Sequence, residues 1–395
     1  MTSLEPSRFR ICTPGETFSR VSPYFSRLGI TRVAAQTGLD RVGIPVWCAY
    51  TPNAKAIVIA QGKGMDDDSA RTSATMEAVE RVIATQPDCE LHTSSYATLQ
   101  ETGKVAHKMT ILLSSGGQPI ADDEQIDWTR ARRLIDHSDI WVPYDAVCFD
   151  RTRPNPRFWL STDGLASGNT LNEAIMHGLL ERVERDALAL WAIDMPQRRF
   201  QNRIQLTSLA DDTIQTMLRR IDQAGLEIAL FNITSDLGVP CISALMRPKE
   251  ATNRKPRHVD VTLGAGCSPF PLVAAARAIS EAVQSRMTFI AGARDDLMPE
   301  TFSRPVDPSL LRAFTGPEAV CIKQLDELPG KTTELALDAL LKRLQTHGIS
   351  ELFAVDLTPD WLPVSVAKVM APQLESPDGD RRQRVGQRAL LRRLQ

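Results

Sequence analysis

The chain has 395 residues, of which 43% are hydrophobic, enough to bury one large core or two smaller ones. Its 46 basic and 48 acidic residues nearly balance, so the overall basic field that is typical of nucleic-acid-binding proteins is missing. No apolar run reaches the roughly 18 residues that a membrane span needs, and the first residues lack the basic-then-apolar pattern of a signal peptide. We therefore expect a cytoplasmic protein with no nucleic-acid partner and no membrane span.

Alternating helical and strand patterns predict an α/β fold of mixed α+β character, in one intertwined domain over 1–395. Its sub-regions are an N-terminal segment at 1–60, a core at 61–330 and a C-terminal αβ unit with a basic tail at 331–395. The expected helices are 16–28, one that begins after the capping cluster at 66–69, then 171–193, 207–225, 271–291, 332–347 and a short amphipathic one at 389–394. The expected strands are 46–50, 56–61, 228–233, 242–247 and 351–357, while 90–160 mixes strands and loops.

Four polar residues of the helix that follows the capping cluster share one side. Each residue of a helix advances by about 100°, which places Ser73, Glu77, Glu80 and Arg81 in one sector. Crowded carboxylates raise one another's pKa unless a cation neutralises them. Carboxylate oxygens suit Mg²⁺, and arginine suits phosphate oxygens. This stripe therefore indicates a site for a metal-bound polyphosphate.

A second acidic stripe occurs in the helix expected at 171–193. Its polar members are Asn169, Glu173, Glu181, Glu184 and Arg185. Ile175, Leu179 and Val183 occupy the opposite side, so the helix has an apolar back and an acidic front. Taken singly, each Glu-x-x-Glu-Arg run can also be an ordinary solvated ion pair. Related sequences at 77–81, 181–185 and 281–286 together favour three walls of one site.

Seven short motifs occur in order along the chain. They are Gly38–Trp47, Gln61–Gly64, Ser73–Arg81, Gly164–Thr170, Glu173–Asp186, Gly264–Gly266 and Glu281–Arg286. In this order and at this spacing they resemble the YcaO-domain family over nearly the whole chain. No GxxxxGK[ST] segment is present, so a Walker-type phosphate loop is excluded. The glycines at 61–64 can mark a turn, or Lys63 can contact phosphate.

The resemblance implies a YcaO fold, with helices packed on mixed sheets around a non-Walker pocket for ATP and Mg²⁺ in the core at 61–330. By position, it implies that the metal ligands are Glu77, Glu80, Glu173, Glu181 and Glu184. The residues expected to bind the nucleotide are Lys63, Ser73, Arg81, Asn169, Arg185, Gln284 and Arg286. Among these sets Glu181, Arg185 and Arg286 are expected to take part in catalysis.

The activity that the resemblance implies is ATP-dependent phosphorylation of a peptide backbone amide, which turns the amide oxygen into a leaving group. The attacking group then decides whether an azoline, a thioamide or an amidine forms. Many azoline-forming relatives end in a proline-rich PxPxP tail, whereas this chain ends in an arginine-rich segment. It resembles instead the subgroup encoded beside a TfuA partner, so we expect thioamide formation in a peptide or protein with a TfuA-like partner, a sulfur donor and a homodimeric enzyme.

Several alternatives remain open at this stage. An azoline cyclodehydratase or an amidine-forming enzyme would share every motif, and a non-catalytic ATP-binding or peptide-binding scaffold is the rival of another class. The seven cysteines form no CxxC pair and indicate neither zinc nor disulfides, although Cys267 could relay sulfur near the site. His177 is more consistent with a structural residue than with a base. The C-terminal arginines can form a patch for an anionic partner or a solvated helical end.

Overall fold

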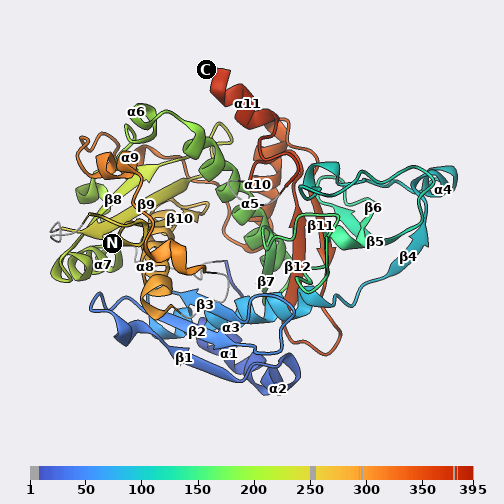
Figure 1. The fold of residues 1–395 in the computed structure, drawn as a ribbon, viewed down its shortest axis with the longest axis horizontal. Coiled ribbons are helices and arrows are strands. Elements are labelled where there is room, and N and C mark those ends of the chain that lie inside the picture. The colour runs from blue at the N-terminus through green and yellow to red at the C-terminus, as the bar shows by residue number, and fades with distance from the viewer. Residues whose placement is uncertain are drawn as a thin grey trace.

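The computed structural model describes residues 9–249, 255–292, 294, 297–376, 379 and 381–394. Within them the strands form two three-stranded sheets and one six-stranded sheet, with helices packed against each (Figure 1). The expected mixed class of helix and sheet is confirmed, and the ladders between the named strands are antiparallel. None of the described helices is long and apolar enough to cross a membrane.

The N-terminal sheet lies at the bottom of Figure 1 and carries the first acidic helix. Its strands, in spatial order, are β1 (Arg32–Ala35), β2 (Val46–Tyr50) and β3 (Ile59–Lys63). The helices of this region are α1 (Pro14–Val21), α2 (Phe25–Leu28) and α3 (Asp67–Thr85). Asp66 caps α3 by accepting a hydrogen bond from the Ser69 amide, as the capping cluster predicted. Helix α3 packs against β2 and β3.

The second three-stranded sheet repeats this arrangement. Its strands, in spatial order, are β10 (Thr262–Cys267), β9 (Cys241–Pro248) and β8 (Leu226–Asn232). The helices of this region are α6 (Pro196–Arg199), α7 (Asp212–Gln223), α8 (Pro271–Ala291) and α9 (Pro308–Leu311). Helix α8 packs against β10 and β9, so a long helix again covers an outer strand of a small sheet.

The six-stranded sheet lies beside the two three-stranded sheets and extends to the right in Figure 1. Its strands are β4 (Leu91–Ser94), β5 (Ile126–Arg133), β11 (Phe353–Asp356), β12 (Ser365–Met370) and β7 (Leu165–Gly168), with β6 (Asp139–Pro143) paired to β5. Its helices are α4 (Tyr96–Glu101), α5 (Leu171–Ile193), α10 (Thr333–Thr346) and α11 (Gln387–Leu394). Helix α5 packs on β7 and β12.

Glycines let the long helices approach the strands unusually closely. A Cβ at Gly62 would lie 2.0 Å from the Ala74 nitrogen of α3, and one at Gly264 would lie 2.2 Å from the Ala282 nitrogen of α8. Both positions therefore exclude any side chain. Because Gly62 lies inside β3, the interpretation of 61–64 as a turn is wrong, and close packing against α3 accounts for this glycine.

The long helices agree with prediction better than the strands do. The observed bounds of β2, α5 and α8 equal those expected, whereas the strand expected at 56–61 is shifted to Ile59–Lys63 and the helix expected at 207–225 shortens to Asp212–Gln223. Strands β1, β7, β10 and β12 were not predicted from the sequence. Strand β7 is buried at all four positions, so it lacks the alternation that identifies a half-exposed strand.

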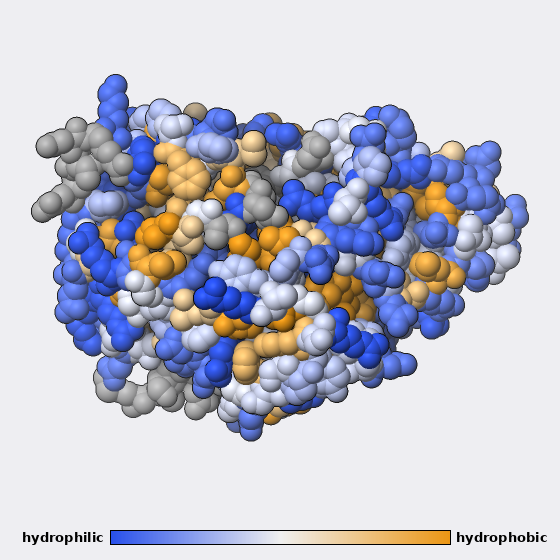
Figure 2. Space-filling model, turned by 60° about the horizontal axis from the view of Figure 1, so that its bottom comes forward, coloured by the Kyte–Doolittle hydropathy of each residue, from blue (hydrophilic) through white to orange (hydrophobic). Residues whose placement is uncertain are grey.

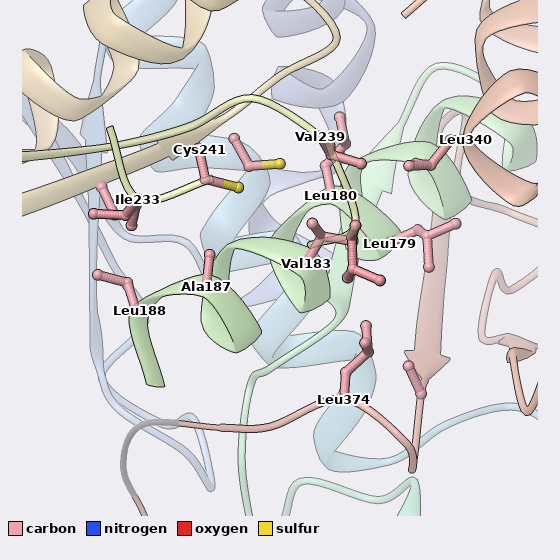
Figure 3. Packing of buried hydrophobic residues seen from close by; sticks show 14 of the residues in the cluster. Leu179, Leu180, Val183, Ala187, Leu188, Ile233, Val239, Cys241, Leu340 and Leu374 are labelled. Carbon is pink, nitrogen blue, oxygen red and sulfur yellow. The ribbon is translucent and has the colours of Figure 1, made fainter. Parts of the chain in front are cut away.

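The apolar back of α5 lies in the main hydrophobic core, as predicted. Leu179 and Val183 are at most 1% exposed and belong to the same cluster as Leu340 of α10 and Leu374 (Figure 3). On the surface, the view from the side of the N-terminal sheet shows apolar side chains gathered near the centre of that face, with hydrophilic ones around them (Figure 2). Because the apolar side of α5 packs into the core, its acidic side faces away from the core and toward the candidate site.

Candidate active site

A cavity of about 650 Å³ lies between α3, α5 and α8. Residues of β3, β7 and β10 complete its walls, so each of the three sheets contributes a strand. Nine of the residues predicted from sequence line it: Lys63, Ser73, Glu77, Glu80, Arg81, Glu181, Glu184, Arg185 and Gln284. The three related helical sequences do form three walls of one cavity.

The edges of the lining strands hold the carboxylates in place. Glu77 Oε2 accepts a hydrogen bond from the Gln61 amide at 3.1 Å, and Glu184 Oε2 accepts one from the Cys267 amide at 2.9 Å. Glu181 Oε2 likewise accepts from the Gly164 amide at 3.1 Å, beside the start of β7. Strand-edge amides need partners when buried, and these side chains supply them. Each of these carboxylates is therefore held in a defined orientation.

Glu80 is fixed by a side chain rather than by backbone. The Ser167 hydroxyl of β7 donates to Glu80 Oε1 at 2.6 Å, which ties α3 to the six-stranded sheet. Burial raises the pKa of Glu80 to about 8, and the charges of Glu77 and Glu181 add to the rise. The carboxylates of Glu77 and Glu181 thus disfavour a further negative charge on Glu80 in the ligand-free protein.

Other carboxyls of the cavity show the same crowding. Burial raises the pKa of Glu184 to about 7, with Glu281 contributing, and burial also raises the pKa of Glu181 although Arg185 opposes it. A bound cation would relieve this crowding. In the part of the chain described, no three carboxylate, histidine or cysteine groups are grouped as a metal site. Carboxylate oxygens beside a polyphosphate suit Mg²⁺, which proteins commonly hold by one or two carboxylates while phosphate oxygens and water complete its shell.

Cationic side chains are interleaved with the carboxylates. Lys63 Nζ lies 2.7 Å from Glu281 Oε2, and Arg185 Nη2 lies 3.4 Å from Glu181 Oε1. Arg81 pairs with Glu77 on the same helix. The buried Nε atoms of Arg81 and Arg185 donate no hydrogen bond to any described residue. These donors suit the oxygens of a polyphosphate.

Three predicted site residues lie outside the cavity lining: Asn169, Glu173 and Arg286. Glu173 accepts from the Ile11 amide at 2.7 Å and the Asn169 amide at 2.9 Å, so its contacts tie the N-terminal segment to the start of α5. Arg286 donates to Asp40 at 2.7 Å. Residue 286 lies about 200° from Gln284 around α8, which explains why one faces the cavity and the other does not.

Arg277, Glu281 and Arg10 line the cavity but are missing from the set predicted by sequence. Arg277 precedes Glu281 by four residues, and Glu281 precedes Gln284 by three. This is the spacing that identified the other two stripes. That signal could have found them. Arg10 precedes every motif and carries no such signal.

The contacts of His177 and Cys267 bear on the open interpretations of these residues. Arg277 Nη2 lies 3.1 Å from His177 Nε2, and burial together with Arg277 holds the pKa of His177 well below its usual range. A neutral histidine that accepts from arginine agrees with the structural interpretation. Cys267 lines the cavity but is only 1% exposed, and its amide holds Glu184.

The ligand-free protein should lose stability as the pH rises from about 5 to about 8. In this window folded Glu80, with its pKa raised from 4.5 to about 8, keeps a proton that the unfolded chain has released. The free energy of unfolding therefore falls with rising pH. Urea unfolding at several pH values should show the decline, and Glu80→Gln should flatten it. The same pH dependence in the parent and in Glu80→Gln would contradict the burial of this carboxyl.

A curated relative covers nearly the whole chain. A protein from Rhizobium leguminosarum bv. trifolii, described as an uncharacterized protein in the tfuA 3' region, is 37% identical over 377 residues, which is 93% of this chain and 88% of the relative. The expected resemblance to proteins found beside TfuA is therefore supported by a relative of high coverage.

Solved structures share the fold. A heterocyclase in complex with substrate and cofactor matches with a TM-score of 0.76 and 21% identity, over 95% of this chain and 54% of the heterocyclase, so the chain spans about half of that protein's length. YcaO from Methanopyrus kandleri, bound with AMPPCP and Mg²⁺, matches with a TM-score of 0.71 and 23% identity, over 93% and 92% of the two chains.

The model of one protein family matches residues 61–375 of this chain. That family is described as YcaO cyclodehydratase, ATP- and Mg²⁺-binding, which are the two cofactors that the sequence predicted. The matched range contains α3, α5 and α8 and thus the three helical walls of the cavity. The chain belongs to the YcaO family.

Proposed function

We propose that this protein is an ATP- and Mg²⁺-dependent enzyme that activates a peptide backbone amide and, with a TfuA-like partner, converts it to a thioamide. The observation that carries the proposal is the convergence of acidic and basic side chains from α3, α5 and α8 on one cavity. Family membership supplies the cofactors, and the relative in the tfuA 3' region favours the thioamide product over an azoline or an amidine.

The proposed reaction requires charge control more than covalent catalysis by the protein. When bound, ATP supplies the phosphoryl group that makes the amide oxygen a leaving group, and Mg²⁺ neutralises phosphate charge. We assign Mg²⁺ to carboxylates drawn from Glu77, Glu80, Glu181 and Glu184, one or two for each ion. Three of them are held by backbone amides and Glu80 is held by the Ser167 hydroxyl, so little reorganisation is needed when a cation arrives.

We assign the phosphate oxygens to Lys63, Arg81 and Arg185, together with Arg277. Arg185 lies between Glu181 and Asp163, and its pKa is raised by these carboxylates, so it stays charged. Arg277 takes the place that the sequence analysis had given to Arg286, because Arg277 lines the cavity and Arg286 is bonded to Asp40. A fixed guanidinium can hold a phosphate in line with its acceptor.

The proposal extends to partners that lie outside this chain. The substrate-bound heterocyclase with the same fold supports a peptide substrate, although that protein is about twice as long. A sulfur donor is needed because thioamide formation replaces an oxygen by sulfur. We keep a homodimer in the cytoplasm as the proposed state of the enzyme.

Calorimetric titration of the purified protein with ATP, with and without Mg²⁺, is the first test, and saturable magnesium-dependent binding is expected. Candidate peptides are then incubated with the protein, ATP, Mg²⁺, sulfide and a TfuA-like protein, and their masses are compared. Exchange of oxygen for sulfur raises the mass, whereas azoline formation removes water and lowers it. Absence of binding would contradict the nucleotide site, and loss of water would replace the thioamide with the azoline product.

A further inference from the structure

The arginine-rich residues 381–394, here called the C-terminal arm, fold back onto α5. The arm ends in α11, which packs against α5 (Figure 1). Arg388 pairs with Asp186 within α5, and Arg392 pairs with Asp194 at the C-terminal cap of the same helix. These arginines therefore have internal partners and are not all available as a patch for an anionic partner.

The Arg388 pair is the more deeply buried of the two. Its guanidinium donates from Nε at 2.9 Å and from Nη2 at 3.0 Å to the two oxygens of Asp186, whose side chain is fully buried. Asp186 Oδ1 also accepts from the Glu375 amide at 2.9 Å. Asp186 directly follows Arg185 of the cavity. A buried carboxylate with a bidentate arginine is strongly destabilised if its partner is removed.

Glu375 fastens the other end of the arm. Its carboxylate is buried and accepts from the Gly386 amide at 2.8 Å and the Ala389 amide at 3.0 Å, at the first turn of α11. These are amides that a helix leaves without internal partners. The carbonyl of Glu375 accepts from Arg182 Nη2 at 3.0 Å. Glu375 thus joins the arm to a second residue of α5.

Arg182 continues the contacts to the cavity wall. Its Nη1 lies 2.8 Å from Ser376 Oγ and 3.0 Å from Asp163 Oδ2. The other oxygen of Asp163 lies 3.6 Å from Arg185 Nε. The neighbouring Gly164 amide holds Glu181 at 3.1 Å. A continuous set of polar contacts therefore runs from α11 to two residues that line the cavity.

We propose that the C-terminal arm is a positioning element of the nucleotide site: Arg388, through Asp186 and the contacts of Glu375, Arg182 and Asp163, holds Arg185 and Glu181 in their binding orientation. The inference rests on the proposed assignment of Arg185 and Glu181 to the nucleotide. Arg388 itself lines no part of the cavity and acts only through these residues.

Two variants test the inference. Arg388→Gln and Arg392→Gln remove the same group from the same helix: the first loses two-point ion pairs with Asp186 and with Asp236, and the second loses one with Asp194. Only Asp186 adjoins the cavity residues. Calorimetry should show that Arg388→Gln raises the Kd for ATP in the presence of Mg²⁺ by about tenfold, equivalent to about 1.4 kcal/mol. Arg392→Gln should stay within about twofold of the parent, and Arg388→Lys should recover part of the affinity.

Glu375→Gln provides a second route if Arg388→Gln fails to fold. The glutamine side chain has one acceptor oxygen, whereas the two oxygens of the Glu375 carboxylate accept from the backbone amides of Gly386 and Ala389. The arm should therefore loosen while the Arg388–Asp186 pair is left intact. This variant should also raise the Kd. Parent-like affinity in folded Arg388→Gln or Glu375→Gln, or an equal loss in Arg392→Gln, would overturn the positioning role alone. Failure of the parent to bind ATP would overturn the proposed function and this inference with it.

Discussion

Replacing Glu181 by glutamine should abolish ATP-dependent turnover while leaving the protein folded. Glu181 lines the cavity, and one of its oxygens is held by the Gly164 amide. The substitution keeps the volume and an acceptor for this amide but removes the charge proposed to bind Mg²⁺. Because burial raises the pKa of Glu181, its charge is costly in the ligand-free protein, so the free energy of unfolding should be unchanged or slightly higher.

The control for this experiment is Glu101→Gln, which makes the same chemical change at the exposed C-terminal end of α4. Turnover is measured as ATP consumption in the presence of peptide, and folding is measured by thermal unfolding. The control should behave like the parent in both. If Glu181→Gln turned over ATP at the rate of the parent, the assignment of this carboxylate to the metal would be wrong.

Replacing Leu179 by alanine should lower the free energy of unfolding by about 2 to 5 kcal/mol. Leu179 is completely buried on the back of α5, in the cluster that also holds Leu340 and Leu374 (Figure 3). Truncation leaves a cavity in the core. The surrounding helices are held by other contacts and cannot move far enough to fill it. Helix α5 also presents Glu181 and Arg185, so a loss of activity at elevated temperature should accompany the loss of stability.

Leu335→Ala is the matched control for this substitution. Leu335 lies on α10 and is 56% exposed, so its truncation should change the free energy of unfolding by less than about 0.5 kcal/mol. Both free energies come from urea unfolding at one pH and temperature. An equal effect of the two variants, or a negligible effect of Leu179→Ala, would show that the back of α5 does not form the core as described.

Prediction succeeded where a long periodic pattern carried the information. The bounds of α5 and α8 were expected correctly because each is a helix of more than twenty residues with a continuous apolar side. The short strands β7 and β10 were missed because β7 is buried at all four positions and β10 at all but Leu263, and because their glycines pack against helices. Such strands show neither alternation nor β-branched enrichment, and so have little signal in a single sequence.

The candidate site divides in the same way. The stripes on α3 and α5 could be identified from spacing, and the same spacing could have replaced Arg286 by Arg277, since residues 277, 281 and 284 share one side of α8. The part played by Asn169 and Glu173 could not be found in this way. Their contacts are made with Ile11, Thr17 and Arg20, which lie about 150 residues earlier in the chain.

The sequence by itself determined the family, its two cofactors and the acidic and basic sides of the helices, because these depend on residue type and on helical period. Only the tertiary structure decided which stripes face the same cavity, which carboxylates are held by strand edges, and that Arg388 reaches Asp186. Contacts of this kind join residues that are far apart in the chain. Their pairing depends on how the sheets and helices pack, which no local pattern encodes.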